Sequence, residues 1–332
     1  MGNTRIAVDI GTTKTAVYQV GAGVILCEPS LVAVSGYGRQ TVNTVGKEAK
    51  KLLGKSAKGT TVYAPVSEGE IDKFSSAKIM IEEFLKKIEL SRASALTEVL
   101  VTLPCGTESA AAKKFKELFA SCGLPNVRFI ESPVATAVGA GAPVSDANPC
   151  FVIDMGGGVT NVAAVSLGGV IVGVSANIGG NLIDNAIIDY VEEHYKLRVG
   201  MQTAERIKCE IGSLLPGDTT STVIYGRDLG SGSPRSMSIQ AKDIIDPIKL
   251  YVNEVYEIAA RVMAKLPPEV SAGIRTTGVY LAGGLSGIIG MEEYFYNEFS
   301  LPVNVSDNPG LLSVLGAGRI MQNEKVYKRL RF

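Results

Sequence analysis

The stretch FVIDMGGGVTNV, residues 151–162, decides the fold of this chain. Its apolar start ends in Asp154, and three glycines follow before a second β-branched run begins at Val159. The pattern predicts a hairpin of two strands joined by a turn without side chains. Backbone N–H groups in such a turn approach a phosphate group closely, and a carboxylate at the strand end suits a hydrated Mg²⁺ ion.

A second copy of this pattern, IAVDIGTTKTAV, lies near the N-terminus at residues 6–17. Aligning Asp9 with Asp154 also aligns Gly11 with Gly156, at a constant offset of 145 residues (154 minus 9). A duplicated strand–turn–strand unit predicts two similar domains that face each other. We expect their two turns to hold one phosphate chain and its metal ion from both sides.

Length and composition are typical of a globular protein with two cores. The chain has 332 residues, of which 46% are hydrophobic and 20% are charged. Its net charge of zero provides no general attraction to nucleic acid, so we expect no nucleic-acid partner. The five cysteines form no CxxC pair, and neither a signal peptide nor a run of 18 apolar residues occurs. We therefore expect a cytoplasmic protein with reduced thiols.

Strand-like and helix-like segments alternate in both halves of the chain, which predicts a mixed α/β architecture. Three successive strands are expected in residues 5–34, and the longest helix is expected in residues 244–266. Thr203 is expected to cap the helix that follows it. Another strand, at residues 278–282, runs into the glycine turn that begins at Gly283.

The motifs together resemble the actin-like ATPase superfamily and, within it, the bacterial MreB/Mbl cytoskeletal proteins. Residues 9–12 and 154–158 are similar to its two phosphate motifs, and residues 281–284 to its adenosine motif. The narrower resemblance to MreB/Mbl rests on segments spread along the chain: CEPS at 27–30, AAVSL at 163–167, TAERIK at 203–208, PPE at 267–269 and GAG at 316–318.

The resemblance implies the actin-like two-domain fold, which consists of duplicated ribonuclease-H-like α/β domains around an interdomain nucleotide cleft. Domain I is expected at residues 1–144, with a small inserted subdomain at about 33–66. Domain II is expected at residues 145–332, with its small subdomain at about 181–244. The C-terminal helix, expected at residues 311–325, is predicted to return to domain I.

The resemblance also implies ATP or ADP as cofactor, with Mg²⁺ held near Asp9 and Asp154 through water. The residues expected to contact the nucleotide are Gly11, Thr12, Thr13, Lys14, Gly156, Gly157, Gly158, Gly179, Gly180, Glu205, Lys208, Gly283, Gly284 and Leu285. Three alternatives remain open. Glu205 and Lys208 are also spaced for an exposed ion pair one helical turn apart. Lys14 is also compatible with a solvated lysine, and Gly179 and Gly180 with a purely packing role.

Two positions depart from the family pattern at the site of hydrolysis. The family typically has Glu-Glu-Pro before an alanine-rich helix, whereas this chain has Ser132 in place of the second Glu. The family usually has Thr after the three glycines, and this chain has Val159. Both usual residues position the attacking water, so we expect nucleotide binding with slow hydrolysis. Glu131 is the candidate substitute.

By resemblance, the chain is expected to self-associate into cytoskeletal filaments for cell shape and wall synthesis. Copolymerisation with other MreB-like proteins is a further expectation. Residues 325–332 combine four basic with four apolar side chains, which favours peripheral contact with the inner face of the membrane; a solvated tail is the alternative. Other functions left open are a non-polymerising chaperone-like ATPase, a sugar or acetate kinase, and a filament that positions a plasmid or organelle.

Overall fold

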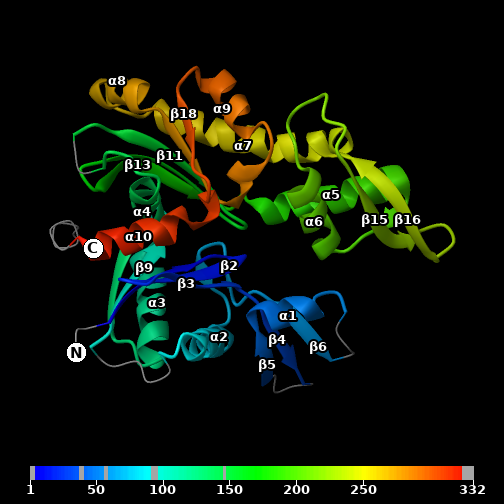
Figure 1. Cartoon of the computed structure of the whole chain (residues 1–332), viewed down its shortest axis with the longest axis horizontal. Coiled ribbons are helices and arrows are strands. Elements are labelled where there is room, and N and C mark those ends of the chain that lie inside the picture. The colour runs from blue at the N-terminus through cyan, green and yellow to red at the C-terminus, as the bar shows by residue number, and fades with distance from the viewer. Residues whose placement is uncertain (1–3, 37–40, 56–58, 91–95, 145–146, 324–332) are drawn as a thin grey trace.

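The computed structural model describes residues 4–36, 41–55, 59–90, 96–144 and 147–323. Two five-stranded sheets form its centre, one from each half of the chain. In Figure 1 the sheets lie one above the other, with helices α4 (Ser132–Gly139) and α10 (Leu312–Gln322) between them. Two smaller lobes project from these sheets on the same side of the molecule.

The two large sheets have the same topology. In each, three strands run parallel and a hairpin continues the sheet with two antiparallel pairings. The first sheet has the order β10 (Asn126–Glu131), β9 (Glu98–Leu103), β1 (Arg5–Ile10), β2 (Lys14–Gln19), β3 (Gly23–Pro29). The second has the order β18 (Val303–Val305), β17 (Val279–Ala282), β11 (Cys150–Met155), β12 (Thr160–Ser166), β13 (Gly169–Ala176). The predicted duplication is confirmed, and so is the mixed α/β architecture.

Each lobe contains a three-stranded sheet and at least one helix. The lobe of the first half contains β5 (Thr41–Val45), β4 (Val32–Ser35), β6 (Thr60–Tyr63) and α1 (Gly46–Leu52). The lobe of the second half contains β14 (Leu197–Arg198), β15 (Ser221–Asp228), β16 (Pro234–Gln240), α5 (Gly180–Tyr195) and α6 (Met201–Ile211). A short hairpin, β7 (Val66–Ser67) and β8 (Glu70–Ile71), follows the first lobe in the chain.

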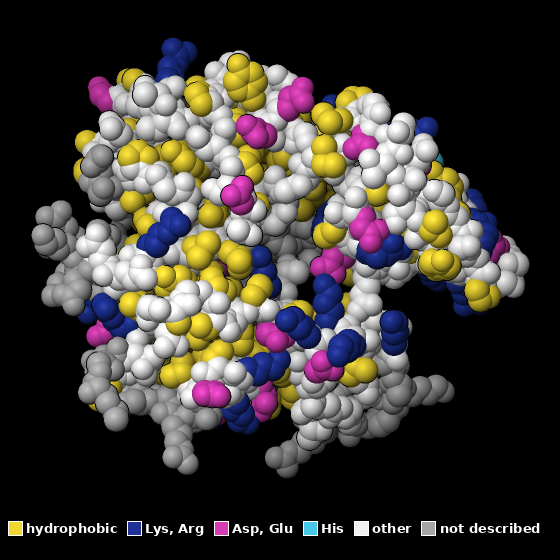
Figure 2. All heavy atoms as spheres, viewed as in Figure 1, with side chains coloured by type: hydrophobic (Ala, Val, Ile, Leu, Met, Phe, Trp, Pro, Cys, Tyr) yellow, Lys and Arg dark blue, Asp and Glu magenta, His cyan; other side chains and the backbone are white. Residues whose placement is uncertain are grey.

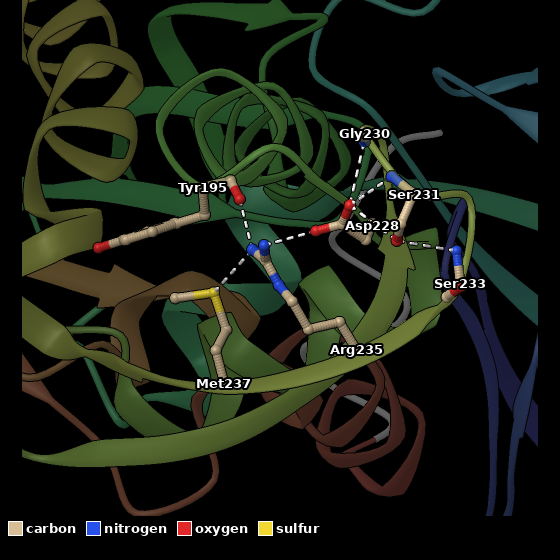
Figure 3. Close-up of polar contacts among 7 residues, drawn as sticks. All are labelled: Tyr195, Asp228, Gly230, Ser231, Ser233, Arg235 and Met237. Atoms are coloured by element: carbon tan, nitrogen blue, oxygen red, sulfur yellow. Dashed lines mark hydrogen bonds and ion pairs between the residues drawn. The ribbon is translucent and has the colours of Figure 1, made fainter.

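The turn between β15 and β16 is fixed by a polar network (Figure 3). Asp228 accepts hydrogen bonds from the N–H groups of Ser231 (2.8 Å) and Gly230 (3.0 Å) and pairs with Arg235 at 2.6 Å. These hydrogen bonds, with the Ser231 contribution largest, hold the pKa of the Asp228 carboxyl below its ordinary value. Arg235 also donates to the carbonyl of Tyr195, which ties the turn to the end of α5.

The remaining helices cover the outer faces of the large sheets, so each half has its own apolar core. Phe84 and Phe119 are almost fully buried in the first core, as are Phe151 and Phe295 in the second. The helices of the first half are α2 (Phe74–Lys87) and α3 (Ser109–Ser121). Those of the second are α7 (Ile245–Met263), α8 (Pro268–Thr277) and α9 (Met291–Phe299), with short 3₁₀ turns at Ala241–Ile244, Gly284–Gly287 and Pro309–Leu311.

Small residues let α4 and α10 approach closely between the sheets. A β-carbon on Gly316 would overlap the carbonyl of Ala135, and one on Gly139 would overlap the backbone of Leu312. α10 also contacts β1, β2 and β9 of the first half, although it belongs to the second half of the sequence. In the GAG motif at residues 316–318, Gly316 therefore serves the close packing of α10 on α4, and Gly318 lies against the Tyr18 ring of β2.

Three details differ from the sequence predictions. Residues 5–35 form four strands rather than three, because the chain leaves the first sheet after Pro29 and starts a separate small sheet at Val32. Thr203 is not an N-cap: α6 starts two residues earlier, and Gly200 occupies the cap with extended backbone. The longest helix ends at Met263, three residues before the predicted end at Leu266.

Among the described residues, no helix is long and apolar enough to cross a membrane. Helix α10 ends at Gln322. The proposed membrane-binding segment at residues 325–332 and the last two residues of the predicted helix at 311–325 lie outside the described residues.

Candidate functional site

The two repeated turns have the same backbone hydrogen bond. Gly11 donates its N–H to the carbonyl of Lys14 at 3.0 Å, and Gly156 donates to the carbonyl of Val159 at 2.9 Å. In both turns the acidic residue two positions earlier lies at the end of a strand, β1 or β11. The sequence repeat is therefore also a geometric repeat.

The two turns meet between the halves of the chain. A β-carbon on Gly157 would overlap the hydroxyl of Thr13, and a β-carbon on Gly158 would overlap that of Thr12. A cavity of about 400 Å³ lies beside them and receives residues from both halves. Because glycine has no β-carbon, Gly157 and Gly158 let the two turns approach each other closely beside this cavity.

Most of the predicted site residues line this single cavity. They are Asp9, Gly11, Thr12, Thr13, Lys14, Ser132, Asp154, Gly156, Gly157, Gly158, Val159, Gly180, Glu205, Lys208, Gly283, Gly284 and Leu285. The structure thus brings together residues that are up to 276 positions apart in sequence (285 minus 9).

Asp9 and Asp154 both line the cavity, and both residues are partly buried. Asp9 Oδ1 accepts a hydrogen bond from Thr102 at 2.7 Å, and Asp154 Oδ2 accepts from Thr136 at 2.9 Å and from Ser132 at 3.1 Å. Burial, together with the charge of Asp9, raises the pKa of Asp154 to about 6. Burial also raises the pKa of Asp9.

Two buried carboxylates, of which the charge of Asp9 raises the proton affinity of Asp154, favour a cation beside them. Each keeps one oxygen that none of these hydroxyls uses. Within the described part of the chain, no group of three or more His, Cys, Asp or Glu residues could hold a metal ion. A hard cation such as Mg²⁺ fits this donor set, because it keeps several waters and takes further oxygens from a phosphate ligand.

Helix α6 contributes two oppositely charged side chains that do not pair with each other. Glu205 pairs with Lys50 of the first lobe at 2.7 Å, and Lys208 pairs with Asp184 of α5 at 2.8 Å. Lys208 also donates a hydrogen bond to the carbonyl of Gly180 at 2.8 Å. The alternative of an exposed Glu205–Lys208 ion pair is therefore not realised, and both residues face the cavity.

Two predicted residues lie outside the cavity lining. A β-carbon on Gly179 would lie 2.6 Å from the carbonyl oxygen of Gly157, so its glycine allows α5 to pack on the turn. Glu131 accepts a hydrogen bond from the N–H of Gly106 at 3.0 Å, and the cavity is lined by its neighbour Ser132 instead.

The sequence did not identify several cavity residues. The polar ones include Thr102, Asn161, Asn181, Asp184, Glu210 and Ser313, and the apolar ones include Pro104, Ile288, Ile289 and Pro309. Of these residues, Asn161 left a signal in the sequence, because it is a polar residue at the position where the first copy of the repeat has Ala16. In the structure its side chain is buried. Its side-chain oxygen accepts a hydrogen bond from the N–H of Cys105 at 2.9 Å, which links the two halves.

A second, more open space adjoins the cavity between the two lobes. Lys and Arg side chains gather around it in Figure 2. Its volume is about 610 Å³, and its lining includes Lys47, Lys50, Lys51, Lys55 and Arg206 together with Glu205 and Cys209, which the two spaces share. This positive entrance favours the approach of an anionic ligand.

The two large sheets have the same topology, and each presents to one cavity a glycine turn that follows an aspartate. This arrangement defines an actin-like protein. The family described as MreB/Mbl protein matches residues 3–329, and this chain therefore belongs to the MreB/Mbl family. The cell shape-determining protein MreB of Escherichia coli (strain K12) is 33% identical over 327 residues, which cover 97% of this chain and 94% of that protein.

Solved structures agree with this assignment. MreB5 of Spiroplasma citri bound to ADP has a TM-score of 0.92 at 27% identity, with 98% of both chains covered. The same protein bound to AMPPNP has a TM-score of 0.90, again at 27% identity, with 99% of this chain and 98% of that chain covered. The MamK double helical filament shares the fold, with a TM-score of 0.77 at 18% identity over 97% of this chain and 99% of that chain.

Proposed function

We propose that this protein binds ADP or ATP with Mg²⁺ in the cavity and assembles into cytoskeletal filaments that serve cell shape and wall synthesis. The observation that supports it best is the convergence of two equivalent acidic turns, one from each half, on one cavity. The similar MreB5 of Spiroplasma citri has been solved with ADP and with AMPPNP.

The residues at the cavity suggest a role for each part of the site. The turns at 11–14 and 156–158 would hold the phosphates through backbone N–H groups, with Lys14 adding a positive charge. Asp9 and Asp154 would hold Mg²⁺ through water; when bound, this ion neutralises phosphate charge.

The far end of the cavity has the features of a sugar and base site. Glu205 and Lys208 provide polar side chains there, and Gly283, Gly284 and Leu285 line the neighbouring wall. Ile288 and Ile289 add apolar surface for a flat ring. We assign these residues to the nucleoside part of the ligand.

We also propose the division into domain I (1–144) and domain II (145–332), with small subdomains at about 33–66 and 181–244. In support, each half has its own large sheet and core, and each lobe has its own small sheet. α10 extends from the second half to pack against β1, β2 and β9 of the first.

Sedimentation with and without Mg·ATP, followed by electron microscopy of the pellet, tests the filament proposal. We expect nucleotide-dependent filaments, and we expect that excess chelator prevents their assembly. Monomers that persist in ADP, ATP and AMPPNP across a range of salt concentrations would refute assembly. Titration with ADP in the same samples separates this outcome from a failure of nucleotide binding.

We further propose cytoplasmic filaments that copolymerise with other MreB-like proteins and contact the inner face of the membrane. The proposed contact is the basic and apolar segment at residues 325–332, which lies outside the described residues. Deletion of this segment should abolish co-flotation with liposomes that contain anionic lipid. Undiminished flotation of the truncated protein would place the contact elsewhere.

A further inference from the structure

Asp184 and Lys208 form an unusually buried ion pair at the wall of the cavity. Their side chains are 4% and 10% exposed, whereas those of the neighbouring Lys50–Glu205 pair are 37% and 28% exposed. Both Asp184 and Lys208 line the cavity. Burial raises the pKa of Asp184, and the charge of Lys208 opposes this increase.

An ion pair whose sole role was to join two helices would have a lower desolvation cost at the surface. Removing two charges from water usually cancels most of their attraction, so a buried pair is weak evidence of a stabilising role. Asp184 lies in the second turn of α5 and Lys208 in the last turn of α6, and these helices already pack through Ile183, Ile187, Ala204 and Ile207. Helix packing alone therefore gives no reason for this pair.

The geometry around the Lys208 ammonium explains its position better. A lysine ammonium has three N–H donors. The Gly180 carbonyl accepts one at 2.8 Å. Asp184 Oδ1 forms an ion pair with the nitrogen at 2.8 Å but has no hydrogen-bond partner among the described residues. Among the described residues, the Gly180 carbonyl is the one hydrogen-bond acceptor of this nitrogen, so donor capacity remains for a ligand in the cavity.

We propose that Asp184 is a positioning residue: with the Gly180 carbonyl, its carboxylate fixes the Lys208 ammonium so that one N–H faces an acceptor oxygen of the bound nucleotide. This inference rests on the proposed nucleotide function of the same cavity. It assigns to Asp184 an effect on ligand affinity that acts through Lys208. The Gly180 position supports it, because a β-carbon there would lie 2.8 Å from the Lys208 nitrogen and displace it.

A double-mutant cycle on the full chain tests the proposal with ADP as the probe. We expect Lys208→Met to weaken ADP binding about 10-fold or more, as for a lost hydrogen bond to a charged group. Asp184→Asn keeps the shape of the side chain but removes its charge, and we expect a comparable loss. The double variant should bind no weaker than Lys208→Met alone, because Asp184 acts through Lys208.

The matched control is Glu192→Gln, which removes an exposed ion pair with Arg198 near the end of the same helix α5. It should leave ADP affinity unchanged. The unfolding temperature of every variant, measured without ligand, shows how far each substitution destabilises the fold apart from its effect on ADP binding.

Two results would overturn the proposal. One is an Asp184→Asn protein with a lower unfolding temperature but wild-type ADP affinity, as expected of a simple link between helices. The other is a double variant whose loss equals the product of the two single losses. If Asp184→Asn does not fold, Asp184→Glu replaces it. This change moves the carboxylate by one methylene group, so ADP affinity should fall, and wild-type ADP affinity in this variant would overturn the proposal. A wild-type protein that binds no ADP would instead refute the proposed function.

Discussion

Thr13 and Gly157 come from opposite halves of the chain, and a β-carbon on Gly157 would overlap the Thr13 hydroxyl. The two repeated turns are thus in contact at the point where the cavity receives residues from both halves. A side chain added at Gly157 or Gly158 must therefore push the halves apart or displace the side chains of Thr12 and Thr13.

The first prediction is that Gly157→Val abolishes most nucleotide binding. The added side chain overlaps Thr13 and occupies the space next to the backbone N–H groups, so we expect the ADP affinity to fall at least about 10-fold. Titration with ADP measures the loss. Gly217→Val is the control, because Gly217 is exposed and a β-carbon there would have no neighbouring atom within 4 Å. Equal affinity in both variants would show that the hairpin is only a turn.

The second prediction concerns the stability of the protein when no Mg²⁺ is bound at the site proposed at Asp9 and Asp154. The pKa of Asp154 is raised from 3.8 to about 6, so the folded protein binds this proton more tightly than the unfolded chain does. The contribution of Asp154 to the free energy of unfolding is therefore largest below about pH 4, and it is lost as the pH rises to about 6. At pH 7.5 the charged form costs on the order of 2–3 kcal/mol.

Asp154→Asn should therefore raise the unfolding temperature in chelator at pH 7.5 and remove this pH dependence, while it weakens Mg·ATP binding. Asp228→Asn is the control of opposite sign, because hydrogen bonds lower the pKa of Asp228. It should lose stability at the same pH. An Asp154→Asn protein that is less stable than wild type in chelator at pH 7.5 would contradict the electrostatic argument.

The sequence predicted the parts of the site that lie close together along the chain. Asp9 and Gly11, and likewise Asp154 and Gly156, belong to single hairpins, so short patterns were enough to identify their turns. The repeat then implied that the turns face each other. The alternation of strands and helices indicated a mixed α/β architecture, and the resemblance to the family implied the actin-like two-domain fold.

Contacts between distant segments could not be predicted in the same way. The pairing of Glu205 with Lys50 depends on how the two lobes face each other, and no local pattern contains that information. The direction of the Glu131 side chain depends on the backbone at the start of α4. Glu131 accepts a hydrogen bond from Gly106, whereas the next residue, Ser132, lines the cavity. Local propensity also misplaced the start of α6 at Thr203.

The third prediction is that Gly316→Ala destabilises the protein. At an open helix position this change would stabilise by about 1 kcal/mol, because alanine has the higher helix propensity. Here the β-carbon overlaps the Ala135 carbonyl in the contact between α4 and α10, and we expect a net loss of about 1–3 kcal/mol. Urea unfolding measures the difference. A gain in stability would show that α10 can move away from α4 without loss.

The last prediction is that the wild-type protein hydrolyses ATP slowly. Ser132 donates a hydrogen bond to Asp154 at 3.1 Å and lies 3.3 Å from the Ser313 hydroxyl, so its short side chain is engaged at the cavity wall. Val159 lines the cavity without a hydrogen-bonding group, and Glu131 accepts from the Gly106 N–H instead. The groups proposed to hold ligand and cation are present, whereas the positions expected from the family resemblance to orient water lack their usual side chains.

Phosphate release by the wild type and by the double variant Ser132→Glu, Val159→Thr tests this prediction. A positioned acid–base group contributes about 10²–10⁴-fold, and we expect the double variant to approach the lower end of that range. The gain is limited because a new carboxylate at position 132 lies beside Asp154, whose pKa is already raised by burial and by the charge of Asp9. Gly217→Val should hydrolyse at the wild-type rate. Rapid wild-type hydrolysis that the double variant does not improve would mean that another residue orients the water.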